Sequence, residues 1–394
     1  MNRRQVLQAL SALPLAAYSS RLLAAPRGTG KFLLVFLRGG YDAANLLIPT
    51  SSTFYYESRP NIAIAQPGAD AHAALALDSD WSLHPALQNS VYPLFQNRQA
   101  AFIPFAGTDD LTRSHFETQD SIELGQPINA NRNYQSGFLN RLAGLLHDGS
   151  AISFTDQLPL VFRGNTLIPN MALGQLNKSG LDSRQTKIIA GMYQDNMLAK
   201  PVMEGFDVRD EVIREVTAGM DAASSIGITA KGFELEARRI ATLMKDKYSL
   251  GFVDVGGWDT HVGEGGSSGY LANRFDELGR GLAAYATEMG SHWRNTVVVV
   301  ISEFGRTFRE NGNRGTDHGH GTVYWVLGGN IRGGRIAGDQ IKVNRANLFQ
   351  DRDFPVLNDY RAILGGLLGR LYDLSPAQID TVFPGVKGMD LGLV

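Results

Sequence analysis

Acidic and histidine side chains recur directly after apolar, β-branched runs in three places along the chain. The run at 296–301 is followed by Glu303, the run at 248–255 by the segment GGWDTH, and the run at 31–37 by RGGYD. Ligands of open α/β sheets bind beyond the carboxyl ends of the strands, so these side chains are predicted to meet at one edge. The residues predicted to hold metal there are Asp42, Asp259, His261, Glu303, Asp317, His318 and His320.

Two pairs of these candidate ligands are separated by a single residue, Asp259 with His261 and His318 with His320. In extended backbone, residues two apart project to the same side, so each pair can chelate. The chain contains no cysteine, which limits the ligands to imidazole nitrogen and oxygen, a set that suits Zn, Mn and similar ions. One or two divalent ions held in this way could activate a water and stabilise the leaving oxygen in phosphoryl or related transfer.

Each of these residues also has an ordinary structural explanation. Asp259 could cap a turn, Glu303 could pair with Arg306, and the late histidines could be polar loop residues. The joint pattern at three strand ends favours a shared site. Arg38 and Arg306 could hold an anionic substrate through paired hydrogen bonds, or could form ordinary ion pairs.

The elements that position these residues are predicted from hydrophobic periodicity. Strands are expected at 31–37, 101–106, 248–255, 296–301 and 322–327, and helices at 116–124, 233–248, 274–289 and 358–371. Pro104 shifts the second strand toward a sheet edge. The alternation predicts an α/β fold with a mostly parallel sheet flanked by helices, in a single domain at 29–394. A polar, helix-forming stretch at about 173–227 predicts a helical insertion or cap.

Charge and the amino terminus bear on partners and location. A net charge of -2 gives no sign of binding to nucleic acid or to an anionic membrane. Residues 1–28, with Arg3 and Arg4 before a weakly apolar, Ala-rich segment, predict a twin-arginine signal peptide, although an amphipathic amino-terminal helix is an alternative. The signal implies the twin-arginine export machinery as a partner and a periplasmic or otherwise exported protein. No later segment reaches the length of a membrane span.

Five phrases of the sequence resemble the exported proteins of the domain of unknown function 1501 (DUF1501) family. They are FLRGGYDAANLLIP, TRSHFETQDSIELG, DVGGWDTH, VVVVISEFGRT and GTDHGHGTVYWVLGG, and the similarity spans most of the mature chain. That family is similar to the alkaline phosphatase and sulfatase superfamily. The resemblance implies a largely parallel α/β sheet with a one-metal or two-metal hydrolytic site.

By this resemblance, Asp42 matches the first-strand metal aspartate of the superfamily, and Asp259 with His261 matches its later aspartate and histidine pair. Glu303 stands where the superfamily has an aspartate followed by histidine. Phe304 follows Glu303 here, so the resemblance leaves one ligand to be replaced.

His318 is the predicted replacement, and the late histidine of the superfamily corresponds to His320 or His318. The superfamily nucleophile, a Ser or Thr at a helix amino terminus, corresponds to Ser114 or Thr112, for which helix capping is the structural alternative. His115 beside Ser114 suggests the histidine and serine of a serine hydrolase, but the side chains of sequence neighbours rarely point at each other. The G-x-S-x-G match at 265–269 lacks the strand that leads into a nucleophile elbow.

The resulting hypothesis is an exported, metal-dependent hydrolase of phosphate or sulfate esters that acts on a small anionic substrate with one or two ions, Zn or Mn. The alternative is a non-catalytic exported binding or assembly protein that retains the fold.

Overall fold

The computed structural model describes residues 30–146, 150–173, 183–194, 198–200, 202–207, 209–210, 213–214 and 231–394. The predicted signal peptide at 1–28 lies outside the described residues, as do parts of the predicted insertion at 173–227. The described part of that insertion includes helix α7, Ser183–Tyr193. Among the described residues, none of the helices combines the length and hydropathy of a membrane-spanning segment.

Strands and helices alternate along most of the described chain. The strands are β1 (Lys31–Leu37), β2 (Leu47–Ile48), β3 (Leu75–Ala76), β4 (Ser82–Leu83), β5 (Ala100–Gly107), β6 (Ala151–Ser153), β7 (Leu250–Val255), β8 (Thr296–Ser302), β9 (Thr322–Gly328), β10 (Arg335–Ile336) and β11 (Asn358–Asp359). The other helices are α2 (Ala43–Leu46), α3 (Thr53–Ser58), α4 (Val91–Gln96), α5 (His115–Leu124), α6 (Phe138–Leu145), α9 (Gly232–Asp246), α10 (Tyr270–Met289), α11 (Tyr360–Tyr372) and α12 (Pro376–Val382). The predicted strands and helices lie within a few residues of these bounds.

The main sheet of the described chain has 8 strands in the order β10-β5-β9-β8-β1-β7-β6, with β11 beside β5. Strand β1 pairs in parallel with β7 on one side and with β8 on the other. Strands β6, β10 and β11 are also parallel to their neighbours. A mostly parallel sheet flanked by helices confirms the predicted fold class.

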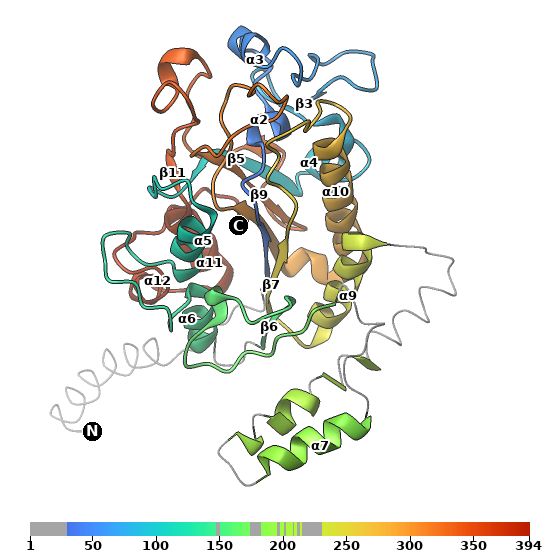
Figure 1. Cartoon of the computed structure of the whole chain (residues 1–394), viewed down its shortest axis with the longest axis vertical. Helices are drawn as coiled ribbons and strands as arrows, with labels where there is room; N and C mark the ends of the chain where they lie inside the picture. The colour runs from blue at the N-terminus through green and yellow to red at the C-terminus, as the bar shows by residue number, and fades with distance from the viewer. Residues whose placement is uncertain are drawn as a thin grey trace, which may run out of the picture.

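Strand β1 contributes side chains to both hydrophobic layers of the molecule, one on each face of the sheet. Leu33 and Val35 belong to a buried cluster with apolar residues of α9 and α10, whereas Phe32 and Leu34 belong to a second cluster with residues of α6, α11 and α12. The alternation follows from the period of two in a strand. Figure 1 shows α9 and α10 on one side of the sheet and α5, α6, α11 and α12 on the other.

Pro104 lies where β5 loses its regular pairing. The register of β5 against β9 shifts between Ile103 and Ala106, and Phe105 within this bulge has φ 53. Proline has no N–H to donate to a neighbouring strand, so a bulge in the second strand from the edge accommodates it.

Strand β9 departs from the parallel arrangement, because it is antiparallel to both β8 and β5. The chain leaves β8 after Ser302 and enters β9 at Thr322, so the connecting loop 303–321 starts and finishes at one edge of the sheet. Strands β1 and β7 end at this same edge, since both are parallel to β8 or to its neighbour. Most of the predicted site residues lie on the loops at this edge.

Candidate functional site

The loops after β1 and β7 touch at the carboxyl edge of the sheet. Gly39 has φ 127, and a Cβ placed there would lie 2.7 Å from the backbone nitrogen of Asp259. Only glycine combines this backbone conformation with so close an approach. Gly39 therefore allows the loop that carries Asp259 to pack closely against the loop after β1, at the carboxyl ends of the strands.

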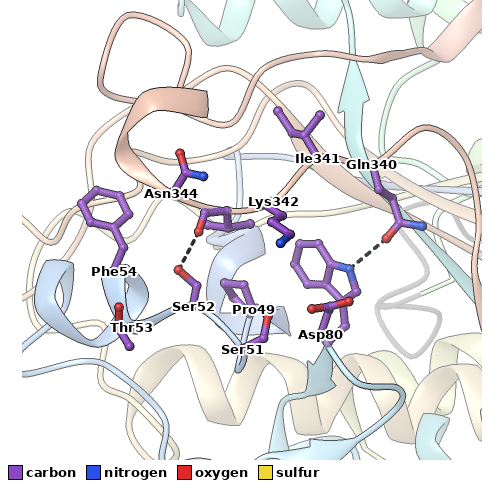
Figure 2. A pocket seen from close by; sticks show the side chains of 12 residues that line it. Pro49, Ser51, Ser52, Thr53, Phe54, Asp80, Gln340, Ile341, Lys342 and Asn344 are labelled. Carbon is purple, nitrogen blue, oxygen red and sulfur yellow. Dashed lines mark hydrogen bonds between the residues drawn. The ribbon is translucent and has the colours of Figure 1, made fainter.

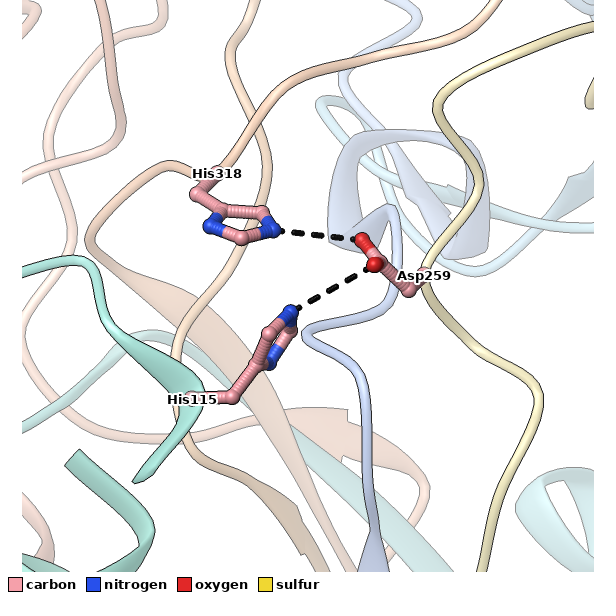
Figure 3. A group of neighbouring side chains, drawn as sticks. All are labelled: His115, Asp259 and His318. Carbon is pink, nitrogen blue, oxygen red and sulfur yellow. Dashed lines mark hydrogen bonds and ion pairs between the residues drawn. The ribbon is translucent and has the colours of Figure 1, made fainter. Parts of the chain in front are cut away.

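Three side chains from distant parts of the sequence converge there: His115 at the start of α5, Asp259 after β7, and His318 before β9 (Figure 3). One ligand atom from each lies within 4.8 Å of the others. His318 Nε2 is 3.2 Å from Asp259 Oδ1, and His115 Nε2 is 3.5 Å from Asp259 Oδ2. The rings of His115 and His318 meet edge to face, with centroids 4.3 Å apart. We call these three residues the histidine–aspartate group.

His261 adjoins this group, and its side chain is 41% exposed to solvent. Its Nε2 atom lies 2.9 Å from Asp259 Oδ1 and 3.1 Å from His318 Nε2. Its Nδ1 atom lies 3.3 Å from Asp317 Oδ1, which also accepts a hydrogen bond of 3.1 Å from the Asn311 amide. Asp317 thus contacts the site through His261.

Glu303 supports His115 from below. Oε1 of Glu303 accepts hydrogen bonds from Gly39 N at 2.8 Å, from His115 Nδ1 at 2.7 Å and from Gln119 Nε2 at 2.8 Å. Burial alone would raise the pKa of Glu303, but the hydrogen bonds from His115 and Gln119 lower it below its ordinary value. The hydrogen bond to Glu303 raises the pKa of His115, against the opposite effect of burial. The structure therefore places Glu303 behind a histidine.

Arg306 holds Asp259 in place. Its Nη1 atom donates to Asp259 Oδ1 at 2.6 Å, and its Nη2 and Nε atoms donate to the backbone oxygen and hydroxyl of Thr316 at 2.7 and 3.2 Å. Burial would raise the pKa of Asp259, but the hydrogen bond from Arg306 lowers it. Arg38, the other arginine considered for anion binding, contacts Asp254 and Glu123 at 2.5 and 2.9 Å.

A buried network lies behind Arg306 and includes Asp42. The carboxylate of Asp42 accepts two bonds from Arg59, one of them at 3.0 Å from Nη2 to Oδ1, and both side chains are inaccessible to solvent. Glu264 accepts hydrogen bonds on Oε2 from Thr260 and Thr316, at 2.7 and 2.9 Å. Asp42 therefore lies outside the histidine–aspartate group, engaged by an arginine.

Oε1 of Glu264 is buried without a hydrogen-bond partner. Burial, and then the neighbouring carboxylate of Asp42, raise the pKa of Glu264 well above its ordinary value. A proton on Oε1 accounts for both observations, because a carboxylic acid can donate to Asp42 where a second carboxylate would repel it.

The remaining predicted residues, His320, Thr112 and Ser114, lie outside the histidine–aspartate group. The ring of His320 contacts that of Phe349 in a tilted arrangement, with centroids 4.9 Å apart, and burial lowers the pKa of His320 to about 4. The Thr112 hydroxyl accepts a 3.4 Å bond from Ser114 N and lies 3.4 Å from the Thr118 hydroxyl. Ser114 is the N-cap residue of α5, but its side chain makes no capping hydrogen bond.

His115 is not among the residues that the sequence predicts to hold metal; there it is only the neighbour of Ser114. One signal could have indicated it. In the segment HFETQ, His115 and Gln119 are four residues apart on a predicted helix and so share one face. Both in fact donate to the same oxygen of Glu303.

The donor atoms of the group fit a divalent cation. His115 Nδ1 donates to Glu303, and His318 Nδ1 donates to the backbone oxygen of Arg113 at 2.9 Å, so both neutral rings present the Nε2 lone pair to Asp259. His115 Nε2 is also buried without a hydrogen-bond partner. A ring nitrogen that faces a carboxylate is attracted to it only if a proton or a cation lies between them. Two imidazoles and a carboxylate are ligands that Zn and related ions accept.

A separate cavity of about 520 Å³ lies between the chain segments 49–54 and 340–344 (Figure 2). The Trp81 indole donates to Gln340 Oε1 at 2.9 Å, and the Ser52 hydroxyl donates to the backbone oxygen of Val343 at 2.6 Å. No member of the histidine–aspartate group lines this cavity. Its lining holds a single carboxylate, that of Asp80, and so does not offer a comparable set of metal ligands.

Comparison with known proteins gives a family but no activity. Residues 30–383 match the model of the family described as protein of unknown function (DUF1501). No curated protein is matched. Among solved structures, the chain is similar to Ps i-CgsB in complex with k-i-k-neocarrahexaose, with a TM-score of 0.38 and 9% identity over 92% of this chain and 75% of that chain. It is also similar to the lipoteichoic acid synthase LtaP from Listeria monocytogenes, with a TM-score of 0.39 and 9% identity over 93% of this chain and 76% of that chain.

Proposed function

The chain belongs to the DUF1501 family, and we propose that it is an exported hydrolase of phosphate or sulfate esters that depends on a divalent cation, Zn or Mn, held by His115, Asp259 and His318. The observation that carries this proposal is the convergence of two Nε2 atoms on Asp259, with each Nδ1 proton already donated elsewhere. The ester class rests on the resemblance of the sequence phrases to the DUF1501 family, which is similar to the alkaline phosphatase and sulfatase superfamily.

A cation at this position would supply the charge that lowers the pKa of a water molecule and neutralises an anionic ester. The residues of the chain do the positioning. Glu303 and the Arg113 carbonyl fix the ring orientations of the two histidines, and Arg306 fixes Asp259. Such partners of metal ligands maintain the geometry of the ligands and increase their basicity.

The attacking oxygen comes from a hydroxyl of the chain or from water. The Thr112 hydroxyl is engaged with Ser114 N and Thr118, which favours Ser114 or a water over Thr112. A free hydroxyl is a weak nucleophile, so Ser114 would need activation by the site.

The test is hydrolysis of 4-nitrophenyl phosphate and 4-nitrophenyl sulfate by protein loaded with Zn or Mn, together with metal analysis of the purified protein. We expect bound metal, activity in the wild type, and loss of activity in His318→Ala but not in His72→Ala, whose histidine is exposed and outside the site. Loss in Ser114→Ala as well would indicate a covalent intermediate, whereas activity that survives in both Ser114→Ala and Thr112→Ala would indicate water. An empty metal analysis together with no hydrolysis would overturn the proposal.

Export is proposed from Arg3 and Arg4 in the segment 1–28. Replacing both arginines by lysine should retain the precursor in the cytoplasm. Unchanged export of this variant would exclude the twin-arginine route.

One observation favours the second candidate, an exported binding or assembly protein that retains the fold. Asp42 and Glu303, two of the predicted ligands, are engaged by Arg59 and by His115 with Gln119, which leaves fewer free ligands than a two-metal site needs. A metal-loaded protein that hydrolyses neither ester would favour this candidate.

A further inference from the structure

Arg113 has a left-handed backbone conformation that is unfavourable for a residue other than glycine unless neighbouring contacts stabilise it. Its φ is 52, in the left-handed region that non-glycine residues seldom adopt. Such a conformation persists where neighbouring contacts over-determine it. The carbonyl of Arg113 accepts the hydrogen bond from His318 Nδ1 at 2.9 Å. The residue therefore links an unusual turn to one histidine of the histidine–aspartate group.

The Arg113 side chain provides the contacts that hold this turn. Its Nε and Nη2 atoms donate to Asp353 Oδ2 at 3.0 and 2.7 Å, and Nη2 also donates to Gln350 Oε1 at 2.8 Å. The Asp353 side chain is inaccessible to solvent. A charge-assisted pair with a buried partner is geometrically strict, so it fixes the loop before α5 against the segment 349–353.

Helix α5 begins two residues later with His115, the other histidine of the group. We propose that Arg113 is a positioning residue that sets the orientation of both His115 and His318, so that their Nε2 atoms face Asp259. This proposal rests on the proposed function only in giving those Nε2 atoms a cation to bind. The placement of the two rings can be tested without one.

The tautomer of His318 is what Arg113 controls most directly. With Nδ1–H donated to the carbonyl of Arg113, the proton of the neutral ring is on Nδ1 and Nε2 carries the lone pair. If the carbonyl turns away, the proton can move to Nε2 and be donated to Asp259, 3.2 Å distant. That tautomer would occupy the atom that a cation requires.

The experiment compares three variants with the wild type in metal-free protein. Arg113→Gly keeps a backbone that tolerates positive φ and removes the guanidinium, Asp353→Asn removes its charged partner, and Arg113→Lys keeps the charge. Arg98→Gly is the matched control, because Arg98 also has positive φ, 59, and lies outside the site. Long-range proton–nitrogen correlation spectra report the His318 tautomer, and titration calorimetry with Zn reports affinity.

We expect a predominant Nδ1–H tautomer of His318 in the wild type and Arg98→Gly, a mixture in Arg113→Gly and Asp353→Asn, and an intermediate result in Arg113→Lys. Zn affinity should fall by about 10-fold to 100-fold in Arg113→Gly and Asp353→Asn, the loss that is usual when a partner of a metal ligand is removed. An unchanged tautomer in both Arg113→Gly and Asp353→Asn would overturn the proposal. If the wild type binds no Zn, the proposed function fails, whereas the tautomer comparison still decides the role of Arg113.

Discussion

The Nε2 atoms of His261 and His318 lie 3.1 Å apart. Two imidazole nitrogens attract at this distance only if a proton is shared between them or a cation lies close to both. His318 Nδ1 already donates to a backbone carbonyl, so a neutral His318 can only accept at Nε2. A neutral His261 is therefore the donor of this contact, and its Nε2 atom would be a fourth ligand for the proposed cation if that cation replaced the proton.

Replacing His318 by alanine should reduce Zn affinity by at least about 10-fold. Loss of a residue that only supports a metal ligand already reduces affinity by about this factor, and His318→Ala removes a proposed ligand itself. His261→Ala should weaken binding too, by a smaller factor if His261 completes rather than forms the site. Titration calorimetry measures both effects, with His72→Ala as the control. Equal affinity in His318→Ala and wild type would exclude this residue as a ligand.

Replacing Glu303 by glutamine should destabilise the metal-free protein by roughly 1–3 kcal/mol near pH 5.5, because a buried hydrogen-bond network loses its charged acceptor. Because the pKa of Glu303 is lowered by folding, this residue stabilises the protein at pH values above its ordinary pKa. That stabilisation is lost as the pH falls through the lowered pKa. Because the pKa of His115 is raised by folding, this residue stabilises the protein at pH values below its ordinary pKa. That stabilisation is lost as the pH rises through the raised pKa.

The two contributions coincide between about pH 4.3 and 6.5, the ordinary values of the two groups. The difference in melting temperature between wild type and Glu303→Gln, measured with chelator present, should therefore be largest near pH 5.5 and smaller at pH 9. A difference that does not change with pH would mean that Glu303 and His115 do not form a charged pair.

Glutamine at position 264 should be tolerated, because Glu264→Gln reproduces the hydrogen bonds of a protonated acid: an oxygen for Thr260 and Thr316, and an N–H for Asp42. Burial raises the pKa of Glu264, so the wild type should lose stability as pH rises from about 4.3 through the raised pKa, and the variant should not show this loss. Thermal unfolding from pH 4 to 9 measures this. Glu264→Ala is the contrasting variant and should destabilise at every pH, and a strongly destabilised Glu264→Gln would indicate an ionised Glu264.

Replacing Asp42 by asparagine should cost about 3–5 kcal/mol of stability, because it leaves the fully buried Arg59 without its counter-charge. Denaturant unfolding measures the loss, and Asp351→Asn, which breaks an exposed pair with Arg345, is the control with a much smaller effect. Zn affinity of the folded variant should be unchanged. A loss of Zn affinity in Asp42→Asn would instead place Asp42 among the ligands.

Much of the fold follows from local sequence. The apolar runs that became β1 and β8 are buried on both faces along almost their whole length, as are the first four residues of β7. Such runs predict parallel strands whose carboxyl ends meet. The antiparallel direction of β9 did not follow, since a strand carries no local mark of its direction.

The candidate site was less accessible to prediction. The partner of Asp42 is Arg59, and nothing in the intervening sequence indicates that α3 brings this arginine back to the carboxylate. His115 lies 144 residues from Asp259 in the sequence (259 minus 115), and its place beside that residue depends on how α5 packs on the sheet. The metal roles of the predicted ligands remain predictions.

The loop 303–321 is tied at both ends to neighbouring strands, β8 and β9, which hydrogen-bond to each other. Backbone hydrogen bonds within the loop also hold it without any contribution from a ligand: Gly305 N donates to the His320 oxygen at 2.9 Å, and Thr307 N donates to the Asp317 oxygen at 2.9 Å. The proposed binding of a cation could therefore follow folding in time. The chain can reach its final shape first and acquire or exchange an ion afterwards, in whichever compartment supplies one.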